Sequence, residues 1–160
     1  MIITATLPGT EETLSAEVRD MDEQALHVLV REHASDEQIR RRLDNLPLSA
    51  EAKVLLYRFS QYSMNVGGTL LRIGKKILEV VLMLVDQFPV TTVGVLLAAL
   101  LTLLIASIPW IGQFLAGFLG PVLMIFGLGA GVWKDINRDH RALADAIQRG
   151  VEIFSPLKVA

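Results

Sequence analysis

The pattern of polar and hydrophobic positions is helical over residues 49–88. Polar residues recur there at every seventh position: Arg58, Asn65, Arg72, Glu79 and Asp86. A spacing of seven puts these side chains on one narrow line of a helix, while apolar residues cover the remaining surface. Gly67, Gly68 and Gly74 weaken the pattern and indicate a bend. The sequence therefore predicts a long helix with a narrow polar stripe, whose candidate lumen or interface residues are Arg72, Lys76, Glu79 and Asp86.

The preceding residues, 1–48, carry the signals of short helices. Two pairs have the three-residue spacing of a helix cap: Asp20 with Glu23, and Ser35 with Gln38. We therefore expect helices over residues 21–33 and 36–45, and Ser49 is expected to cap the next one. Residues 2–7 fit either a short strand or an ordered arm. The sequence thus predicts a small, acidic, mainly helical domain, which is too short to bury a large core alone.

A charge-free stretch follows, because residues 87–133 contain no Asp, Glu, Lys, Arg or His. As helices rising about 1.5 Å per residue, residues 90–108 and 114–133 would extend over ~28 Å and ~30 Å. That length matches the hydrocarbon core of a bilayer. The five residues between them, PWIGQ, contain a helix breaker and an amphipathic Trp, which suits an interfacial turn. The sequence predicts a two-helix transmembrane hairpin over residues 89–133.

The orientation of this hairpin follows from the charges beside it. Basic residues flank it on both sides: Arg72, Lys75 and Lys76 before it, and Lys134, Arg138 and Arg141 after it. The connecting turn is uncharged and could cross a bilayer at low cost. We therefore predict a two-pass integral membrane protein with both termini cytoplasmic. Trp110 and Trp133 would be anchors at opposite membrane interfaces.

Small residues recur along both predicted spans and are typical of helices that pack closely. They are Gly94, Ala98, Thr102 and Ala106 in the first span, and Ala116, Gly120, Gly127 and Gly131 in the second. After the hairpin, residues 134–160 predict an amphipathic helix that docks on a protein surface or lies along the membrane. The predicted fold class is an all-α membrane protein: a helical hairpin of two transmembrane helices, preceded by a long amphipathic helix and a small helical N-terminal domain.

Composition narrows the functional classes. The 160 residues are 52% hydrophobic, with a formal net charge of -2, and the longest basic run is residues 40–42. Nucleic acid is therefore not an expected partner, because phosphate binding needs a concentrated basic face. The chain has no cysteine, and His27, His33 and His140 lack the spacing of a helical metal pair. We expect no catalytic residues, no metal and no cofactor, and hence no enzyme.

The charges of the stripe need a polar environment, because a charged residue in hydrocarbon costs on the order of 3 kcal/mol. Three environments supply one: the membrane interface, a protein stalk, or a lumen shared by several copies. In a ring of subunits, Arg72 and Lys76 would form basic rings, and Glu79 and Asp86 acidic ones. The expected partners are accordingly the lipid bilayer, further copies of the chain as a homo-oligomer, and a protein bound through residues 1–65.

The function predicted from these features is a small integral membrane protein. It would self-associate through its helical hairpin into an oligomeric pore or channel-like assembly, under control of its N-terminal domain. The uncharged hairpin of residues 89–133 resembles the buried hairpin of colicin-type pore-forming domains, a likeness that rests on no specific motif. The alternative is a membrane-anchored adaptor or scaffold that recruits a soluble partner and forms no pore.

Overall fold

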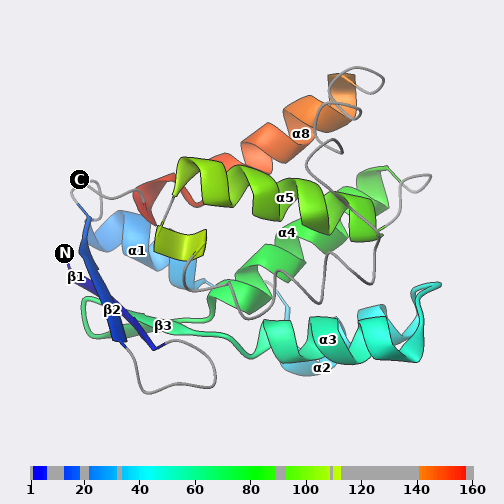
Figure 1. Cartoon of the computed structure of the whole chain (residues 1–160), viewed down its shortest axis with the longest axis horizontal. Coiled ribbons are helices and arrows are strands. Elements are labelled where there is room, and N and C mark those ends of the chain that lie inside the picture. The colour runs from blue at the N-terminus through cyan, green and yellow to red at the C-terminus, as the bar shows by residue number, and fades with distance from the viewer. Residues whose placement is uncertain are drawn as a thin grey trace.

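A computed structural model describes residues 2–6, 13–18, 22–31, 34–88, 93–108, 110–112 and 141–157 of the chain. Over these residues the fold is mixed, with a four-stranded antiparallel sheet beside a group of packed helices (Figure 1). The all-α prediction was therefore wrong. Two stretches that were expected to be mainly helical form strands: the N-terminal residues, and the segment around Gly67 and Gly68.

The sheet has the strand order β2-β1-β3-β4. Its strands are β1 (Ile2–Thr6), β2 (Thr13–Glu17), β3 (Met64–Val66) and β4 (Thr69–Leu71). In the central strand β1, Ile3 and Ala5 are buried while Ile2 is exposed, the alternation expected of a sheet with one face on a core. The choice between a strand and an arm at the N-terminus is thus resolved in favour of a strand.

The hairpin between β3 and β4 replaces the middle of the predicted long helix. Gly67 and Gly68 have φ angles of 56° and 85°, and Val66 pairs with Thr69 across this two-residue turn. Positive φ at both central residues is the requirement of a type I′ hairpin turn, which glycine meets without steric cost. The Gly68 N–H also donates to the Asn65 side chain at 2.9 Å. The long helix is therefore two helices, α3 (Ala50–Ser60) and α4 (Ile73–Gln87).

Local capping signals located the front helices well. Helix α2 (Asp36–Asp44) begins with the expected capping box between Ser35 and Gln38, and Ser49 caps α3 by accepting from the Ala52 N–H at 3.2 Å. Both predictions are confirmed. The helix before them, α1 (Glu23–Val30), is shorter than predicted and is capped by Asp22, so the proposed cap at Asp20 was wrong.

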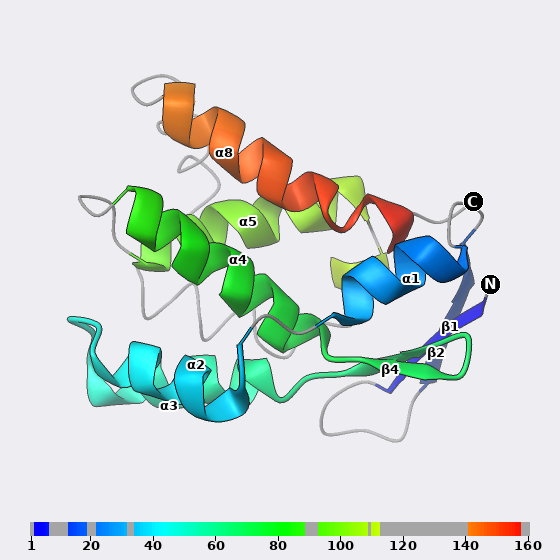
Figure 2. The same ribbon diagram turned by 180° about the vertical axis from the view of Figure 1, so that it is seen from behind.

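Helix α5 (Val93–Ser107) forms from the first predicted span but has only 15 residues, which extend over ~22 Å. No helix in the described part of the chain combines the length and apolarity needed to cross a membrane. This finding overturns the prediction of a two-pass integral membrane protein with a transmembrane hairpin and cytoplasmic termini. The second predicted span, residues 114–133, lies outside the described residues. Most of the apolar surface of α5 is instead covered by protein, because the helix packs between α4 and the C-terminal helix (Figure 2).

The C-terminal helix α8 (Arg141–Glu152) docks on a protein surface, one of the two alternatives left open by its amphipathic pattern. Leu143 and Ile147 are buried against the core, and a short 3-10 helix, η1 (Ser155–Leu157), follows. A Cβ on Gly150 would lie 2.9 Å from Val80 and 3.6 Å from Leu100. Gly150 therefore allows α8 to approach both α4 and α5 closely.

Helix α4 is the centre of the arrangement. In both overall views it lies between α5 on one side and the α2–α3 pair on the other (Figures 1 and 2). Its close approach to the end of α3 depends on Gly74, whose added Cβ would lie only 1.8 Å from the Phe59 carbonyl oxygen. The middle of the polar stripe on α4 therefore lies against other parts of the same chain, whereas Asp86 at its far end is exposed.

Candidate binding grooves around helices α2, α3 and α4

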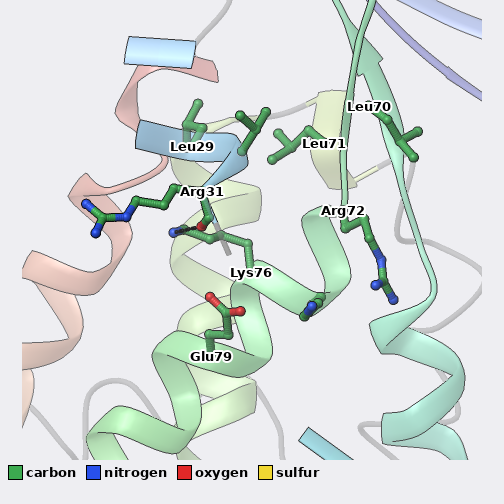
Figure 3. Close-up of a pocket in the computed structure, with 9 residues that line it drawn as sticks. Leu29, Arg31, Leu70, Leu71, Arg72, Lys76 and Glu79 are labelled. Carbon is green, nitrogen blue, oxygen red and sulfur yellow. Dashed lines mark hydrogen bonds between the residues drawn. The ribbon is translucent and has the colours of Figure 1, made fainter. Parts of the chain in front are cut away.

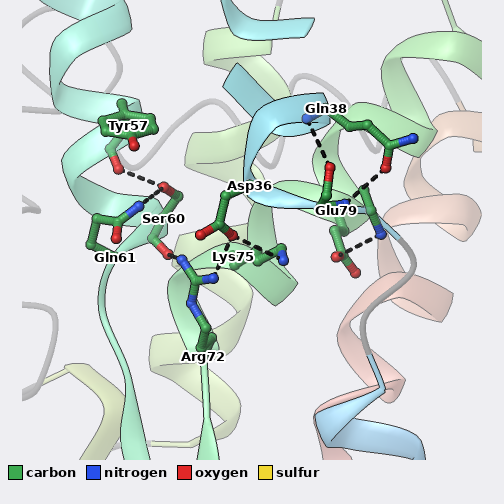
Figure 4. A network of polar contacts seen from close by, with 10 residues as sticks. Asp36, Gln38, Tyr57, Ser60, Gln61, Arg72, Lys75 and Glu79 are labelled. Carbon is green, nitrogen blue, oxygen red and sulfur yellow. Dashed lines mark hydrogen bonds and ion pairs between the residues drawn. The ribbon is translucent and has the colours of Figure 1, made fainter. Parts of the chain in front are cut away.

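The first part of the stripe is paired with the start of α2. Arg72, which immediately precedes α4, forms an ion pair with Asp36, and the Lys75 ammonium lies 3.0 Å from the same carboxylate (Figure 4). Arg72 also donates to the Ser60 carbonyl at 3.3 Å. The hydrogen bonds from Arg72 and then Lys75 hold the pKa of Asp36 below its usual range. Lys75 itself is 2% exposed, so this ion pair joins a buried cation to a carboxylate at the surface.

Lys76 and Glu79 occupy the middle of the stripe, opposite the end of α1. Lys76 is 7% exposed and donates to the Arg31 carbonyl at 3.2 Å. Burial lowers the pKa of Lys76, although the nearby Glu79 carboxylate acts in the opposite direction. Glu79 Oε1 accepts from the Ala34 N–H at 3.3 Å, but its buried Oε2 accepts no hydrogen bond from the residues that the structure describes. Figure 3 shows the two side chains on neighbouring turns of α4, with Lys76 directed at Arg31.

The far end of the stripe, at Asp86, also lies beside α2. Arg42 lies 2.7 Å from the Asp86 carboxylate and also donates to the Leu82 carbonyl at 3.1 Å. All four predicted stripe residues thus lie beside residues 31–42 of the same chain. Sequence reasoning missed the partners Asp36 and Arg42, and it did not include Lys75 in the stripe. The capping box at Ser35 located Asp36 in a first helical turn but carried no information on what that turn faces.

Beside this stripe lies the first of two grooves, which we name the α2–α4 groove. It has a volume of about 370 Å³. Its apolar lining is Ala34, Ile39, Val80, Leu82, Met83 and Ile153, and its charged lining is Arg42, Lys76, Glu79 and Asp86. Met83 is 44% exposed, so the apolar lining reaches the protein surface. The volume lies within the range of about 300–1,000 Å³ usual for small-molecule sites.

The second groove, named the α2–α3 groove, has a volume of about 390 Å³. Its apolar lining is Leu43, Val54 and Tyr57, and its charged lining is Arg40, Asp44, Lys53 and Arg58. The Arg40 guanidinium carbon lies 5.6 Å from the centre of the Tyr57 ring, within the range of a cation–π contact. Lys53 donates to the Asp44 carbonyl at 2.7 Å. The groove therefore combines an aromatic side chain with a mainly basic rim.

The three consecutive arginines of α2 have three different environments. Arg40 lies over Tyr57, Arg41 pairs with Glu37 at 2.6 Å, and Arg42 pairs with Asp86. Successive residues of a helix point about 100° apart, so a basic run on a helix is not a basic patch. Arg40 contributes to the α2–α3 groove and Arg42 to the α2–α4 groove.

The predicted packing and anchor residues fall in several places. In α5, Gly94 and Ala98 are buried, whereas Thr102 and Ala106 are exposed. The Thr102 hydroxyl donates to the Ala98 carbonyl at 2.8 Å within the helix. The half-buried Trp110 donates its indole N–H to the Leu157 carbonyl at 3.0 Å, which ties residues 110–112 to the C-terminal segment. The remaining predicted residues, Ala116, Gly120, Gly127, Gly131 and Trp133, lie outside the described residues.

Within the described ranges, no three His, Cys, Asp or Glu side chains are grouped as metal ligands. His27 is exposed on α1, and His33 and His140 lie outside those ranges. Comparisons with known protein families, curated proteins and solved structures find no match to this chain. The two grooves are therefore the features of the described chain that bear on its function.

Proposed function

We propose that the chain is an adaptor: a binding module without catalytic activity that recruits a protein partner through the α2–α3 groove. The partner segment is acidic and carries one bulky apolar side chain. The single observation that carries this proposal is the exposure of Val54 (51%) and Tyr57 (37%) in a groove with a basic rim. Exposed apolar side chains inside a charged rim are typical of protein interaction sites.

The chemistry of the partner follows from the groove's charge. Three cations and one carboxylate line it, a formal balance of +2, from Arg40, Lys53, Arg58 and Asp44. Opposite charges across an interface increase the association rate and exclude wrongly charged partners. An acidic segment therefore fits the rim, and an apolar side chain fits against Val54 and Tyr57.

Tyr57 is suited to be the anchor of this interface. Its ring contacts the Arg40 guanidinium at 5.6 Å, and its backbone carbonyl accepts from the Ser60 hydroxyl at 2.5 Å. An aromatic ring has few rotatable bonds, so it loses little conformational entropy when a partner packs on it. Tyr and Arg are also over-represented among the residues that contribute most to interface affinity.

Fluorescence anisotropy with labelled peptides tests the proposal. The probe is a glutamate-rich peptide with one central leucine, and the control peptides replace the glutamates by lysine or the leucine by serine. We expect saturable binding of the first peptide only, weakened by raised salt. Tyr57→Ala and Arg58→Glu should each lower its affinity at least about tenfold, which corresponds to ~1.4 kcal/mol.

Arg149→Glu is the matched control, because Arg149 is an exposed arginine on α8, away from the groove. It changes the net charge by the same amount as Arg58→Glu and should leave the affinity unchanged. Equal losses in both variants would show general charge attraction and contradict the proposed groove. Absence of saturable binding by the glutamate–leucine peptide would also reject it.

A further inference from the structure

Lys76 and Glu79 lie where two cavities meet. Both residues line the α2–α4 groove, and both also line a smaller cavity of about 20 Å³ that lies against Leu29 and Leu71 (Figure 3). The smaller cavity has room for a water molecule, whereas the groove has room for a larger ligand. This junction does not belong to the α2–α3 groove, so a ligand bound at it is independent of the proposed adaptor function.

Hydrogen-bonding capacity is left unused at this junction. An ammonium carries three N–H donors, and the Lys76 ammonium makes one described hydrogen bond, to the Arg31 carbonyl. Glu79 Oε2 is buried and accepts none within the described part of the chain. No direct ion pair joins the two side chains among the described contacts. Since buried polar atoms are nearly always hydrogen-bonded, this pair calls for a further partner with both a donor and an acceptor.

We propose that the α2–α4 groove binds a small zwitterion with an ammonium and a carboxylate at one end and an apolar chain at the other, such as an apolar α-amino acid. The ligand carboxylate accepts from the Lys76 ammonium, and the ligand ammonium donates to the Glu79 carboxylate, which lines the groove. Its apolar chain lies along Val80, Met83 and Ile153, which line the same groove.

Charge balance favours a zwitterion over a ligand with a single charge. A ligand with only a carboxylate would be attracted by Lys76 but repelled by Glu79. A ligand with only an ammonium would be attracted by Glu79 but repelled by Lys76. Both groups sit at a largely buried location, where such uncompensated interactions are strong. The Arg42 and Asp86 side chains at the edge of the groove are already paired with each other at 2.7 Å, so they leave the net charge of the groove unchanged.

Isothermal titration calorimetry on the full chain tests the site with matched probes. The probes are L-leucine and its two deletion analogues: 4-methylpentanoate, which lacks the amine, and 3-methylbutylamine, which lacks the carboxylate. We expect saturable binding of leucine, at least about tenfold tighter than either analogue. Failure of leucine, methionine and phenylalanine to bind at millimolar concentration would overturn the proposal. The groove would then hold water and no amino acid. Equal affinity for leucine and either analogue would overturn it too.

Two variants locate the binding. Glu79→Gln keeps the shape of the side chain but removes its charge, and Lys76→Met keeps most of its length. Each should weaken leucine binding at least about tenfold, while Lys53→Met, which removes an ammonium from the other groove, should leave it unchanged. If Lys76→Met fails to fold by circular dichroism, Glu79→Gln decides alone. An unchanged affinity in the folded Glu79→Gln variant would refute the site.

Discussion

Helices α4 and α5 have the same length and pack against each other, yet they are buried in different ways. Each has 15 residues, but α4 carries Lys75, Lys76, Glu79 and Asp86 while α5 carries no charge. Helix α5 needs only apolar neighbours, which α4 and α8 supply. Helix α4 needs polar partners along one line, which residues 31–42 supply. The comparison shows that a very apolar helix and a charged stripe, the two features that suggested a membrane pore, can each be satisfied within one chain.

The apolar side of this comparison is tested by Leu100→Ala in α5. Leu100 is fully buried and lies beside Gly150 of α8, so the substitution removes buried methyl groups and leaves a cavity. We expect the free energy of unfolding to fall by about 2–5 kcal/mol, measured by urea denaturation. This loss should exceed that caused by removing any one charge of the stripe.

Thr102→Ala is its control, because Thr102 is exposed on the same helix and bonds only to the Ala98 carbonyl among the described contacts. We expect a change within about 0.5 kcal/mol. If Thr102→Ala destabilised the protein as much as Leu100→Ala, the packing of α5 between α4 and α8 would be refuted.

How much of this fold the sequence could predict depends on the range of the interactions involved. The caps of α2 and α3 lie within three residues of the groups they bind, so local pattern was sufficient. The β3 and β4 strands have three residues each, too few to show alternation, and within a helical pattern the two glycines of their turn predict a helix bend. The spacing of seven then ran by coincidence through a helix, a strand and a helix cap, at Arg58, Asn65 and Arg72.

The length and environment of α5 could not be predicted from its composition. Hydrophobicity measures how poorly a segment interacts with water, and both a protein core and a bilayer remove it from water. The partners of the stripe were equally inaccessible. Asp36 lies 36 residues before Arg72, and Arg42 lies 44 residues before Asp86. One sequence can place a charge on a helix face, but it does not identify the segment that covers that face.

The charged side of the comparison is tested by Asp36→Asn. This substitution removes the carboxylate shared by Arg72 and the buried Lys75. We expect the free energy of unfolding at neutral pH to fall by about 1–2 kcal/mol, because hydrogen bonds to charged groups are strong but Asp36 itself is half exposed. Glu37→Gln is the control on the same helix. Its pair with Arg41 is exposed on both sides, so we expect a loss within about 0.5 kcal/mol.

Acid should have the same effect as Asp36→Asn. The pKa of Asp36 is lowered in the fold from its ordinary value of 3.8. Its contribution to stability is therefore complete above that value and is lost as the pH falls through the lower, folded-state pKa. Urea denaturation at a series of pH values should show the difference between the parent chain and Asp36→Asn shrinking in that acidic range. A difference that stays constant down to the lowest pH would mean that the carboxylate's charge is not what stabilises this contact.

The smallest expected effect comes from Lys76, whose pKa is lowered by burial. Below its ordinary pKa of 10.5 the unfolded chain keeps the proton on this amine, whereas the folded chain releases it at a lower pH. Between the two values the free energy of unfolding therefore rises with pH. The Glu79 carboxylate favours the charged lysine and so makes this rise smaller. The positive charge of Arg31 disfavours the charged lysine and makes the rise larger.

Lys76→Met should remove this alkaline rise, and Lys53→Met should retain it. The comparison is best made from about pH 8 to 10, because burial raises the pKa of Tyr62 above its ordinary 10.0 and that group lowers stability at higher pH. An identical pH dependence in the parent chain and Lys76→Met would mean that the amine is as well solvated in the fold as in the unfolded chain. Burial would then have no measurable effect on the charge of Lys76. The contrast between the charged helix α4 and the uncharged helix α5 would be smaller than the burial of Lys76 implies.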